Sequence, residues 1–112
     1  MDVTTERQEG VLTAEVGGRI DGSNVAQFEE AIRTAIDEND RAVLIDCENL
    51  GYISSAGLRA VLMTAKSLSS RNAKFALCSM SDPIREVFQI SGFDKIVAIH
   101  PSRAEALASF DS

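Results

Sequence analysis

The sequence predicts an α/β domain built on a mostly parallel sheet. Apolar or Val- and Thr-rich segments typical of strands alternate with segments whose apolar residues recur at helical spacing. Their order over the 112 residues is β-β-α-β-α-β-α-β-α. Each strand after the first pair follows a helix, as parallel strands require. We therefore expect an N-terminal β-hairpin, about five strands and about four helices in one domain spanning residues 1–112.

The first third of the chain predicts a hairpin followed by a helix. Residues 3–8 and 11–17 are strand-like, and Glu9-Gly10 between them suits a two-residue turn. Residues 21–24, Asp-Gly-Ser-Asn, break the second strand and offer helix caps. The helical spacing of Val25, Phe28, Ile32 and Ile36 predicts a helix of about 15 residues that ends at Asn39-Asp40.

The middle of the chain predicts a central strand and a second helix. Residues 42–45 form a short apolar run that closes on Asp46, the pattern of a covered strand. Residues 48–53 are expected to form a loop. Leu58, Val61, Leu62, Ala65 and Leu68 then recur at helical spacing until Ser69-Ser70-Arg71-Asn72 stops the pattern.

The last third predicts two more strands, each followed by a helix. Residues 74–78 form a strand, and Ser81-Asp82-Pro83 starts a helix that Gly92 ends in a left-handed conformation. Residues 95–99 are expected to be the last strand. Ser102, with Glu105 three residues later, makes a capping box for a short terminal helix.

Composition narrows the classes of function. The net charge of −6 disfavours nucleic acid and anionic membrane surfaces, because the eleven Lys and Arg residues are scattered. There is no secretory signal and no apolar run of ~18 residues, so we expect a cytoplasmic protein without a membrane span. Cys47 and Cys78 lie in apolar runs and are expected to be buried, reduced thiols.

Ser54 and Ser55 immediately precede the second helix, so at least one hydroxyl is expected among the unpaired N–H groups of its first turn. Local sequence favours a simple helix cap. The same position also tolerates an anion, because a phosphate on Ser55 would meet free amides and the positive end of the helix dipole. Local sequence leaves both interpretations open.

An enzyme is disfavoured, and we expect no cofactor or metal. His100 lies at the end of a strand without a nucleophile arrangement, and neither common phosphate-binding glycine loop occurs. Asp21 and Asp46 both follow strands at one predicted sheet edge, where they could form a two-carboxylate Mg²⁺ or aspartyl-phosphate site. Capping of their own loops is the favoured interpretation of these two carboxylates.

Three segments carry a resemblance to a known family. Residues 46–59, DCENLGYISSAGLR, resemble the signature of STAS domains, the family of bacterial anti-sigma factor antagonists. Residues 18–21, GRID, look like the turn that this family places before its first helix, and residues 90–96, ISGFDKI, resemble its late Ser-Gly segment. The three motifs occur in the family's order, and the resemblance spans nearly the whole chain.

The resemblance implies a phosphorylation switch. Ser55 matches the phospho-acceptor, and Ser54 stands where the family commonly has Asp, a departure that could add a second acceptor or change the kinase. Asp21 matches the acidic residue beside the phosphorylation loop. Unphosphorylated protein would bind an anti-sigma factor serine kinase and displace sigma factor, phosphorylation of Ser55 would release it, and a PP2C-type phosphatase would reset the switch.

The partner-binding surface is expected around the start of the second helix. It comprises Asp21, Tyr52, Ser54, Ala56, Gly57 and, as an exposed apolar group after the strand at 74–78, Met80. An alternative is a constitutive STAS scaffold or transport-system accessory protein, in which the two serines serve only as caps.

Overall fold

The computed structural model describes residues 1–111 and confirms the α/β class. Within this range the chain forms six strands, four α-helices and one 3-10 turn. In chain order these are β1 (Asp2–Gln8), β2 (Val11–Ile20), α1 (Val25–Ala35), β3 (Ala42–Asp46), β4 (Leu50–Ile53), α2 (Ser55–Ser70), β5 (Lys74–Cys78), α3 (Asp82–Ser91), η1 (Phe93–Lys95), β6 (Ala98–His100) and α4 (Arg103–Ser109).

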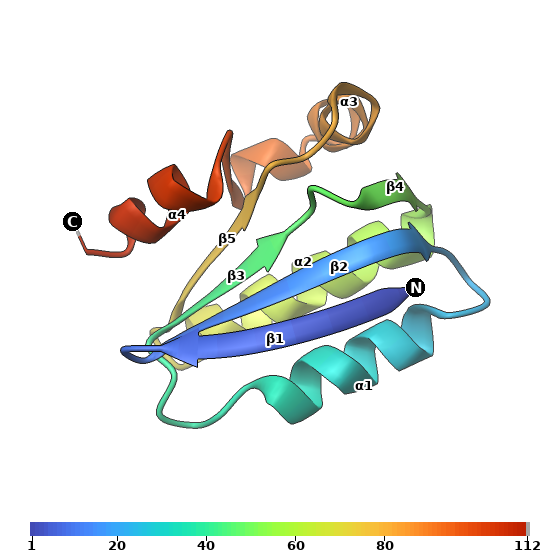
Figure 1. Ribbon diagram of the computed structural model, residues 1–112. Coiled ribbons are helices and arrows are strands. Elements are labelled where there is room, and N and C mark those ends of the chain that lie inside the picture. Colours follow the sequence, from blue (N-terminus) through green and yellow to red (C-terminus); the bar gives the residue numbers. More distant parts are fainter. Residues whose placement is uncertain (112) are drawn as a thin grey trace.

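The sheet has the strand order β1-β2-β3-β5-β6, with β4 paired to β2 (Figure 1). β1 and β2 are antiparallel, and the pairs β2–β3, β2–β4, β3–β5 and β5–β6 are parallel. Glu9 and Gly10 form the predicted two-residue turn, since both have positive φ angles, of 54° and 79°, and Gln8 pairs with Val11. The N-terminal hairpin leading into a mostly parallel sheet is therefore confirmed.

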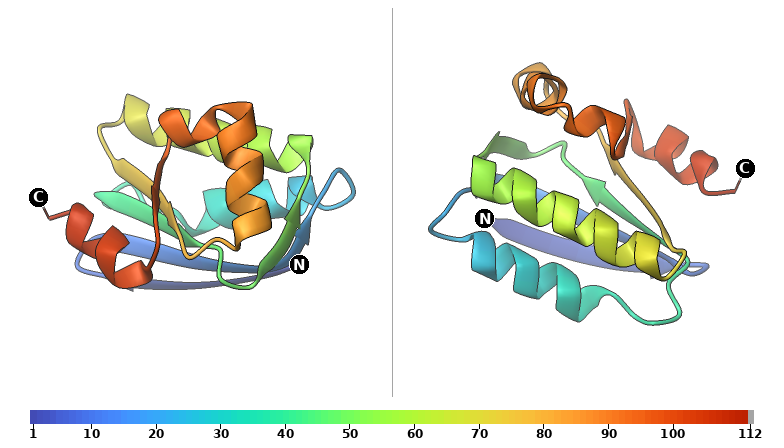
Figure 2. Two further views of the ribbon diagram at one scale, coloured as in Figure 1. Left: turned by 90° about the horizontal axis from the view of Figure 1, so that it is seen from above. Right: turned by 180° about the vertical axis from the view of Figure 1, so that it is seen from behind.

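Helices cover both faces of the sheet (Figure 2). α1 and α2 lie side by side on one face, as the view from behind shows, and their buried residues join Ala14, Val16 and Ile45 in the main core. α4 packs on the other face, where Ala106 and Phe110 contact a second cluster that includes Leu44 and Cys78. A third, smaller cluster contains Leu12, Val43 and Leu68. Alternate residues of the central strands thus pack against helices on opposite faces of the sheet.

The expected loop at residues 48–53 was wrong, because it contains strand β4. β2 is ten residues long, and β3 occupies one of its edges only from Val11 to Glu15. After a short turn the chain continues in the same direction and pairs β4 with Gly18–Ile20, farther along the same edge. No crossover helix is needed, which explains why the alternation rule for parallel strands missed a strand and gave five instead of six.

The first helix is shorter than expected, because α1 ends at Ala35 and not at Asn39-Asp40. The Arg7 guanidinium donates to the Ala35 carbonyl oxygen (2.7 Å) and, through two nitrogens, to the Asp40 carboxylate (2.7 and 2.8 Å). The Asp40 carboxylate also accepts from the Asp37 N–H at 2.8 Å. A side chain from β1 therefore satisfies the end of the helix, which local spacing could not predict.

The last strand begins later than expected, at Ala98 rather than Lys95. Gly92 ends α3 with a φ of 80°, as predicted, but the chain then turns once more through η1. The Ile96 and Val97 N–H groups both donate to the Phe93 carbonyl, and Val97 is buried. Ile96 and Val97 thus belong to a turn, in which Val97 packs in the core and Ile96 is exposed.

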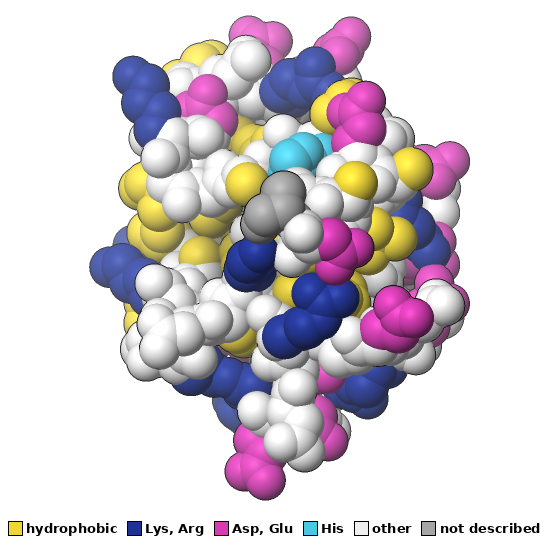
Figure 3. All heavy atoms as spheres, turned by 90° about the vertical axis from the view of Figure 1, so that its left-hand side faces the viewer, with side chains coloured by type: hydrophobic (Ala, Val, Ile, Leu, Met, Phe, Trp, Pro, Cys, Tyr) yellow, Lys and Arg dark blue, Asp and Glu magenta, His cyan; other side chains and the backbone are white. Residues whose placement is uncertain are grey.

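Charges are interspersed on the end of the molecule that carries the β1–β2 turn and the last residues of the chain (Figure 3). Lys and Arg side chains lie next to Asp and Glu side chains across this face, which therefore offers no broad patch of one sign. Among residues 1–111, no helix combines the length and the apolar character needed to cross a membrane.

Candidate functional site

Ser54 is the N-cap of α2. Its side-chain oxygen accepts a hydrogen bond from the Gly57 N–H (3.2 Å), and its carbonyl accepts from the Leu58 N–H (2.9 Å). Its own N–H donates to the Ile20 carbonyl (2.9 Å), which ties the start of the helix to the end of β2. The capping hydroxyl expected before this helix is therefore that of Ser54, and it is engaged in the fold.

Ser55 is the first residue of α2, and its side chain is exposed. Within residues 1–111 no hydrogen bond involves its hydroxyl. The N–H groups of the first two helical residues, Ser55 and Ala56, have no partner within the helix, because only the third and fourth are taken by Ser54. The structure thus offers a free hydroxyl beside two free amides at the positive end of a 16-residue helix.

Gly57 lets this end of the helix approach the sheet closely. A Cβ atom at this position would lie 2.7 Å from the Ile53 Cγ1 and 2.9 Å from the Ile20 Cγ2. Both distances are shorter than carbon atoms tolerate, so a side chain would push α2 away from β2 and β4. The first turn of α2 therefore packs closely on the sheet, which holds Ser55 just beyond the ends of these strands.

Asp21 belongs to the loop that follows β2, beside this helix start. Its carboxylate accepts from the Ser23 hydroxyl (2.5 Å) and the Ser23 N–H (2.9 Å), and these hydrogen bonds hold the pKa of Asp21 below its ordinary value. The Asn24 side chain accepts from the Asp21 N–H and donates to the Arg19 carbonyl. The loop is therefore locked by its own side chains, with Asp21 ionised at neutral pH.

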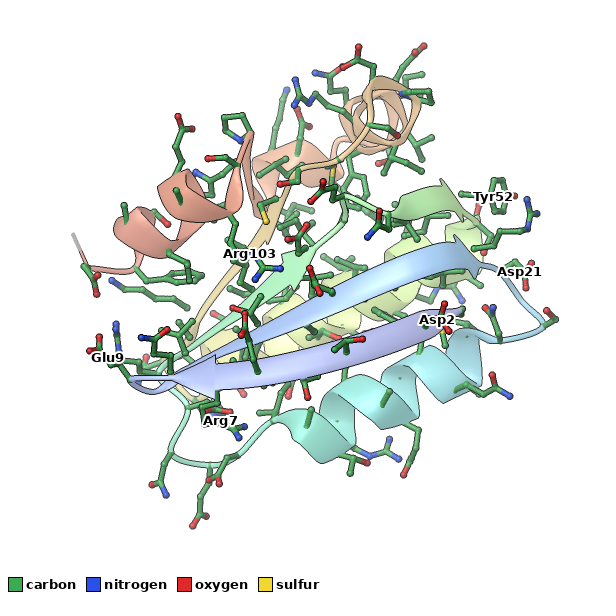
Figure 4. All side chains as sticks on the ribbon, viewed as in Figure 1. Asp2, Arg7, Glu9, Asp21, Tyr52 and Arg103 are labelled. Carbon is green, nitrogen blue, oxygen red and sulfur yellow. The ribbon has the colours of Figure 1, made fainter. Side chains whose placement is uncertain are left out.

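Tyr52 lies at the same end of the sheet as Asp21 (Figure 4), and it forms an exposed pair with Arg19 of the neighbouring strand. The Arg19 guanidinium carbon lies 4.3 Å from the centre of the Tyr52 ring, and its Nε lies 3.8 Å from the Asp21 carboxylate. Tyr52 keeps 41% of its surface exposed. This cation–π contact was not predicted from the sequence, because it depends on the pairing of β2 with the unforeseen β4.

Met80 does not lie on the expected surface. It is only 6% exposed and packs in the main core with Ile84 and Phe88 of α3. Ser79 before it has a φ of 61°, so the chain turns sharply between β5 and α3. The structure therefore brings together Asp21, Tyr52, Ser54, Ser55, Ala56 and Gly57 at one end of the sheet and buries Met80 in the core.

The two-carboxylate site considered as the less favoured interpretation of Asp21 and Asp46 is not assembled. Asp46 is the last residue of β3, it is buried, and its carboxylate accepts two hydrogen bonds from Arg103 of α4 (2.8 and 3.0 Å). Figure 4 shows Arg103 over the middle of the sheet and Asp21 beside Tyr52 at its end. Among the described residues no group of three or more His, Cys, Asp or Glu could hold a metal ion.

Arg103 is a structural residue that sequence reasoning missed. Besides Asp46 it contacts the carboxylates of Glu15 (2.6 Å) and Glu6 (2.8 Å), so one side chain ties α4 to three strands. Hydrogen bonding to Asp46 raises the pKa of the Arg103 guanidinium above its ordinary value. No local pattern could have found it, because its partners lie 57 to 97 residues away in the sequence.

Both cysteines are buried free thiols, as expected. Burial raises the pKa of Cys78 to about 11 and that of Cys47 well above its ordinary value. Cys47 packs in the main core and Cys78 in the cluster under α4, on opposite faces of the sheet. Burial thus disfavours the reactive thiolate at both positions, which agrees with a structural role.

The N-terminal hairpin and the mostly parallel sheet have the arrangement of a STAS domain, and the sequence agrees. The profile of the STAS domain matches residues 2–106, so this chain belongs to the STAS domain family. It is 39% identical over 110 residues to BtrV of Bordetella bronchiseptica, assigned as an anti-sigma factor antagonist, and the match covers 98% of this chain and 95% of BtrV.

Solved structures show the same fold. An anti-sigma factor antagonist from Mycobacterium paratuberculosis superposes with a TM-score of 0.90 at 23% identity, covering 99% of this chain and 94% of the other. The Bacillus cell fate determinant SpoIIAA in its phosphorylated form has a TM-score of 0.72 at 24% identity, covering 96% and 98%. Its unphosphorylated form has a TM-score of 0.79, covering 95% and 93%.

Proposed function

We propose that this protein is an anti-sigma factor antagonist that switches partners by phosphorylation of Ser55. The observation that carries the proposal is that the two adjacent serine hydroxyls have different roles in the structure. Ser54 caps the helix, whereas Ser55 presents an exposed hydroxyl that the fold does not use. A kinase can modify that hydroxyl without breaking a hydrogen bond of the native structure.

A phosphate on Ser55 is compatible with the fold and changes the surface strongly. It adds about 1.5 to 2 negative charges next to free amides, in a first helical turn that contains no acidic residue. A partner that binds closely to this face must then desolvate the dianion or is repelled by it. A coupling of ~3 kcal/mol between the phosphate and partner binding changes affinity by more than about 100-fold.

The proposed partners follow from the family. An anti-sigma factor serine kinase binds the unphosphorylated protein, and ATP-dependent phosphorylation of Ser55 releases it. A PP2C-type phosphatase removes the phosphate and restores binding, and the cycle runs in the cytoplasm. The assignment of the relative BtrV as an anti-sigma factor antagonist and the solved phosphorylated form of SpoIIAA support this proposal. In it the protein is a ligand and a substrate, and not a catalyst.

The proposed contact surface lies around Ser55. Tyr52 and Ala56 flank the acceptor, and Asp21 lies in the loop that follows the neighbouring strand. Gly57 is buried, so its contribution is to hold the first turn of α2 against the sheet. The Tyr52 ring, held by Arg19, is the large exposed apolar group of this set and the side chain that we expect to anchor the partner.

The test uses the anti-sigma factor kinase encoded by the same organism. Purified kinase, ATP and the protein are incubated, and intact mass is measured for the unchanged chain and for Ser54→Ala, Ser55→Ala and Ser69→Ala. Ser69 is an exposed serine at the other end of α2 and serves as the control. We expect one phosphoryl group on every protein except Ser55→Ala. Phosphorylation of Ser55→Ala would contradict the proposal and show that the acceptor is Ser54 or another residue.

Binding distinguishes the switch from simple modification. Ser55→Ala is expected to bind the kinase as well as the unchanged chain does, whereas Ser55→Asp binds at least about tenfold more weakly, a loss of roughly 1.4 kcal/mol. Equal affinity of the Ala and Asp variants would remove Ser55 from the interface.

A second candidate is a constitutive STAS scaffold or transport-system accessory protein. Its support is Ser54, which replaces the Asp common in the family. The capping bond of Ser54 to Gly57 weakens that support, because Ser and Asp cap helices equally well. Intact mass of the protein from its own cells decides between the two candidates. A chain that stays unmodified in every growth condition would favour the scaffold.

A further inference from the structure

Four exposed side chains form a stripe along α2. Ser55, Arg59, Met63 and Lys66 are spaced by four, four and three residues, which places them on one face of the helix. All four are exposed, and Met63 keeps 56% of its surface accessible. The stripe begins at the proposed phosphorylation site and runs away from it along the outside of the molecule.

The charge of this stripe is opposite to that of the chain. The whole protein has 17 acidic and 11 basic residues, yet α2 contains Arg59 and Lys66 and no carboxylate. Within residues 1–111 neither of these two cations forms an ion pair or a hydrogen bond. Arg7 and Arg103, in contrast, are fully used in holding elements together. Arg59 is therefore available for a partner that the unmodified chain does not supply.

We propose that Arg59 is the cation that pairs with the phosphate when Ser55 is phosphorylated. Residues four apart on a helix have Cβ atoms about 5–6 Å apart, within reach of an arginine and a phosphoserine. A guanidinium binds a phosphate through two parallel N–H···O bonds, which fixes its direction as well as its charge. Arg59 needs to leave no other partner to form this pair.

The pair gives Arg59 two roles and rests on the proposed function of Ser55. In the unphosphorylated protein Arg59 and Lys66 present a positive stripe with an apolar side chain between them, suited to an acidic partner surface. In the phosphorylated protein the phosphate holds Arg59 internally. Arg59 is then no longer available to the partner, which also meets the new negative charge. Phosphorylation of Ser55 therefore changes the surface one helical turn beyond the acceptor as well.

The test measures coupling between the phosphate and Arg59 without a kinase. Phosphoserine is incorporated at position 55 during translation, in the otherwise unchanged chain and with Arg59→Gln or Lys66→Gln. Unphosphorylated versions of all three proteins are made in parallel. Lys66 is the matched control, because it is an exposed cation of the same stripe two turns farther along.

The readouts are the urea midpoint of unfolding and the NMR resonance of the Arg59 Nε–Hε group. We expect phosphorylation to raise the urea midpoint in the otherwise unchanged chain and in Lys66→Gln. In both proteins the rise should be about 0.2 M larger than in Arg59→Gln. The Nε–Hε resonance should shift on phosphorylation. Failure of a kinase to modify Ser55 would refute the proposed function, but this measurement would still test the pair, because it needs no kinase. An equal midpoint change in Arg59→Gln, with an unmoved Nε–Hε resonance, would refute the pair even if Ser55 is phosphorylated in cells.

Discussion

Replacing each of the two adjacent serines by alanine should change stability by clearly different amounts. Ser54→Ala removes the side chain that caps the first turn of α2, and leaves the Gly57 N–H without its acceptor. Ser55→Ala removes an exposed hydroxyl for which the described residues offer no partner. The two substitutions remove the same atom at neighbouring positions, so each is the control for the other.

The magnitude follows from the capping bond. Loss of a serine N-cap costs about 1 kcal/mol of the free energy of unfolding, with a range of 0.5–2. The first turn of α2 cannot shift to find a new acceptor, because Gly57 is packed at contact distance against Ile53 and Ile20. At Ser55 alanine has the higher helix propensity, so the change should be within about 0.5 kcal/mol of zero. A difference of about 1 kcal/mol corresponds to roughly 4 °C in Tm for a domain of this size.

Urea unfolding followed by circular dichroism measures both changes. Ser54→Asp should restore the stability that Ser54→Ala loses, because aspartate caps as well as serine does. Equal losses for Ser54→Ala and Ser55→Ala would refute the assignment of the cap. So would a Ser54→Ala protein as stable as the unchanged chain, since the hydrogen bond to Gly57 would then contribute nothing.

Three further predictions concern packing and charge. Gly57→Ala should lower the free energy of unfolding by about 1–3 kcal/mol by overpacking. Gly51→Ala should cost less, because its Cβ would meet its nearest neighbour at an ordinary 3.6 Å. Equal urea midpoints for the two variants would contradict this prediction. Hydrogen bonding to Arg7 holds the pKa of Asp40 below its ordinary value, so this carboxylate should stabilise the fold fully above about pH 4 and lose that effect as the pH falls through its folded pKa. Asp40→Asn should therefore cost roughly 2 kcal/mol at pH 7 and much less near pH 2, and a pH-independent difference would refute it. Arg103→Ala leaves the buried Asp46 carboxylate unpaired and should cost about 3 kcal/mol, against less than about 0.5 for Arg33→Ala at the exposed pair with Glu30, as measured by thermal unfolding.

Elements with strong local signals were predictable, and those that depend on distant partners were not. The hairpin turn at Glu9-Gly10, the second helix and the left-handed Gly92 all follow from residues next to one another in the sequence. Strand β4 is four residues long and pairs only with the far half of β2, so neither its length nor its position had a local signature. The early end of α1 depends on Arg7, 28 residues away from the carbonyl that it satisfies.

The candidate site was predictable in its composition but not in its geometry. The run of residues 46–59 identified the serines and the helix start, and resemblance selected Ser55 over Ser54. Only the tertiary structure shows that the Ser54 hydroxyl accepts from the Gly57 amide while the Ser55 hydroxyl has no partner among the described residues. Apolar character alone suggested Met80 as a surface group, but Met80 follows the sharp turn at Ser79 and packs in the main core.

The sequence by itself determined the α/β class, the hairpin, the family and the position of the exposed serine at a helix start. Those features arise from periodicity, turn chemistry and a contiguous motif, which are local properties of the chain. Tertiary structure alone decided that β4 exists and that Asp46 pairs with Arg103 and not with Asp21. It also decided that Arg19 contacts the Tyr52 ring. Each of these depends on the free energy of contacts between residues far apart in sequence, which no local pattern records.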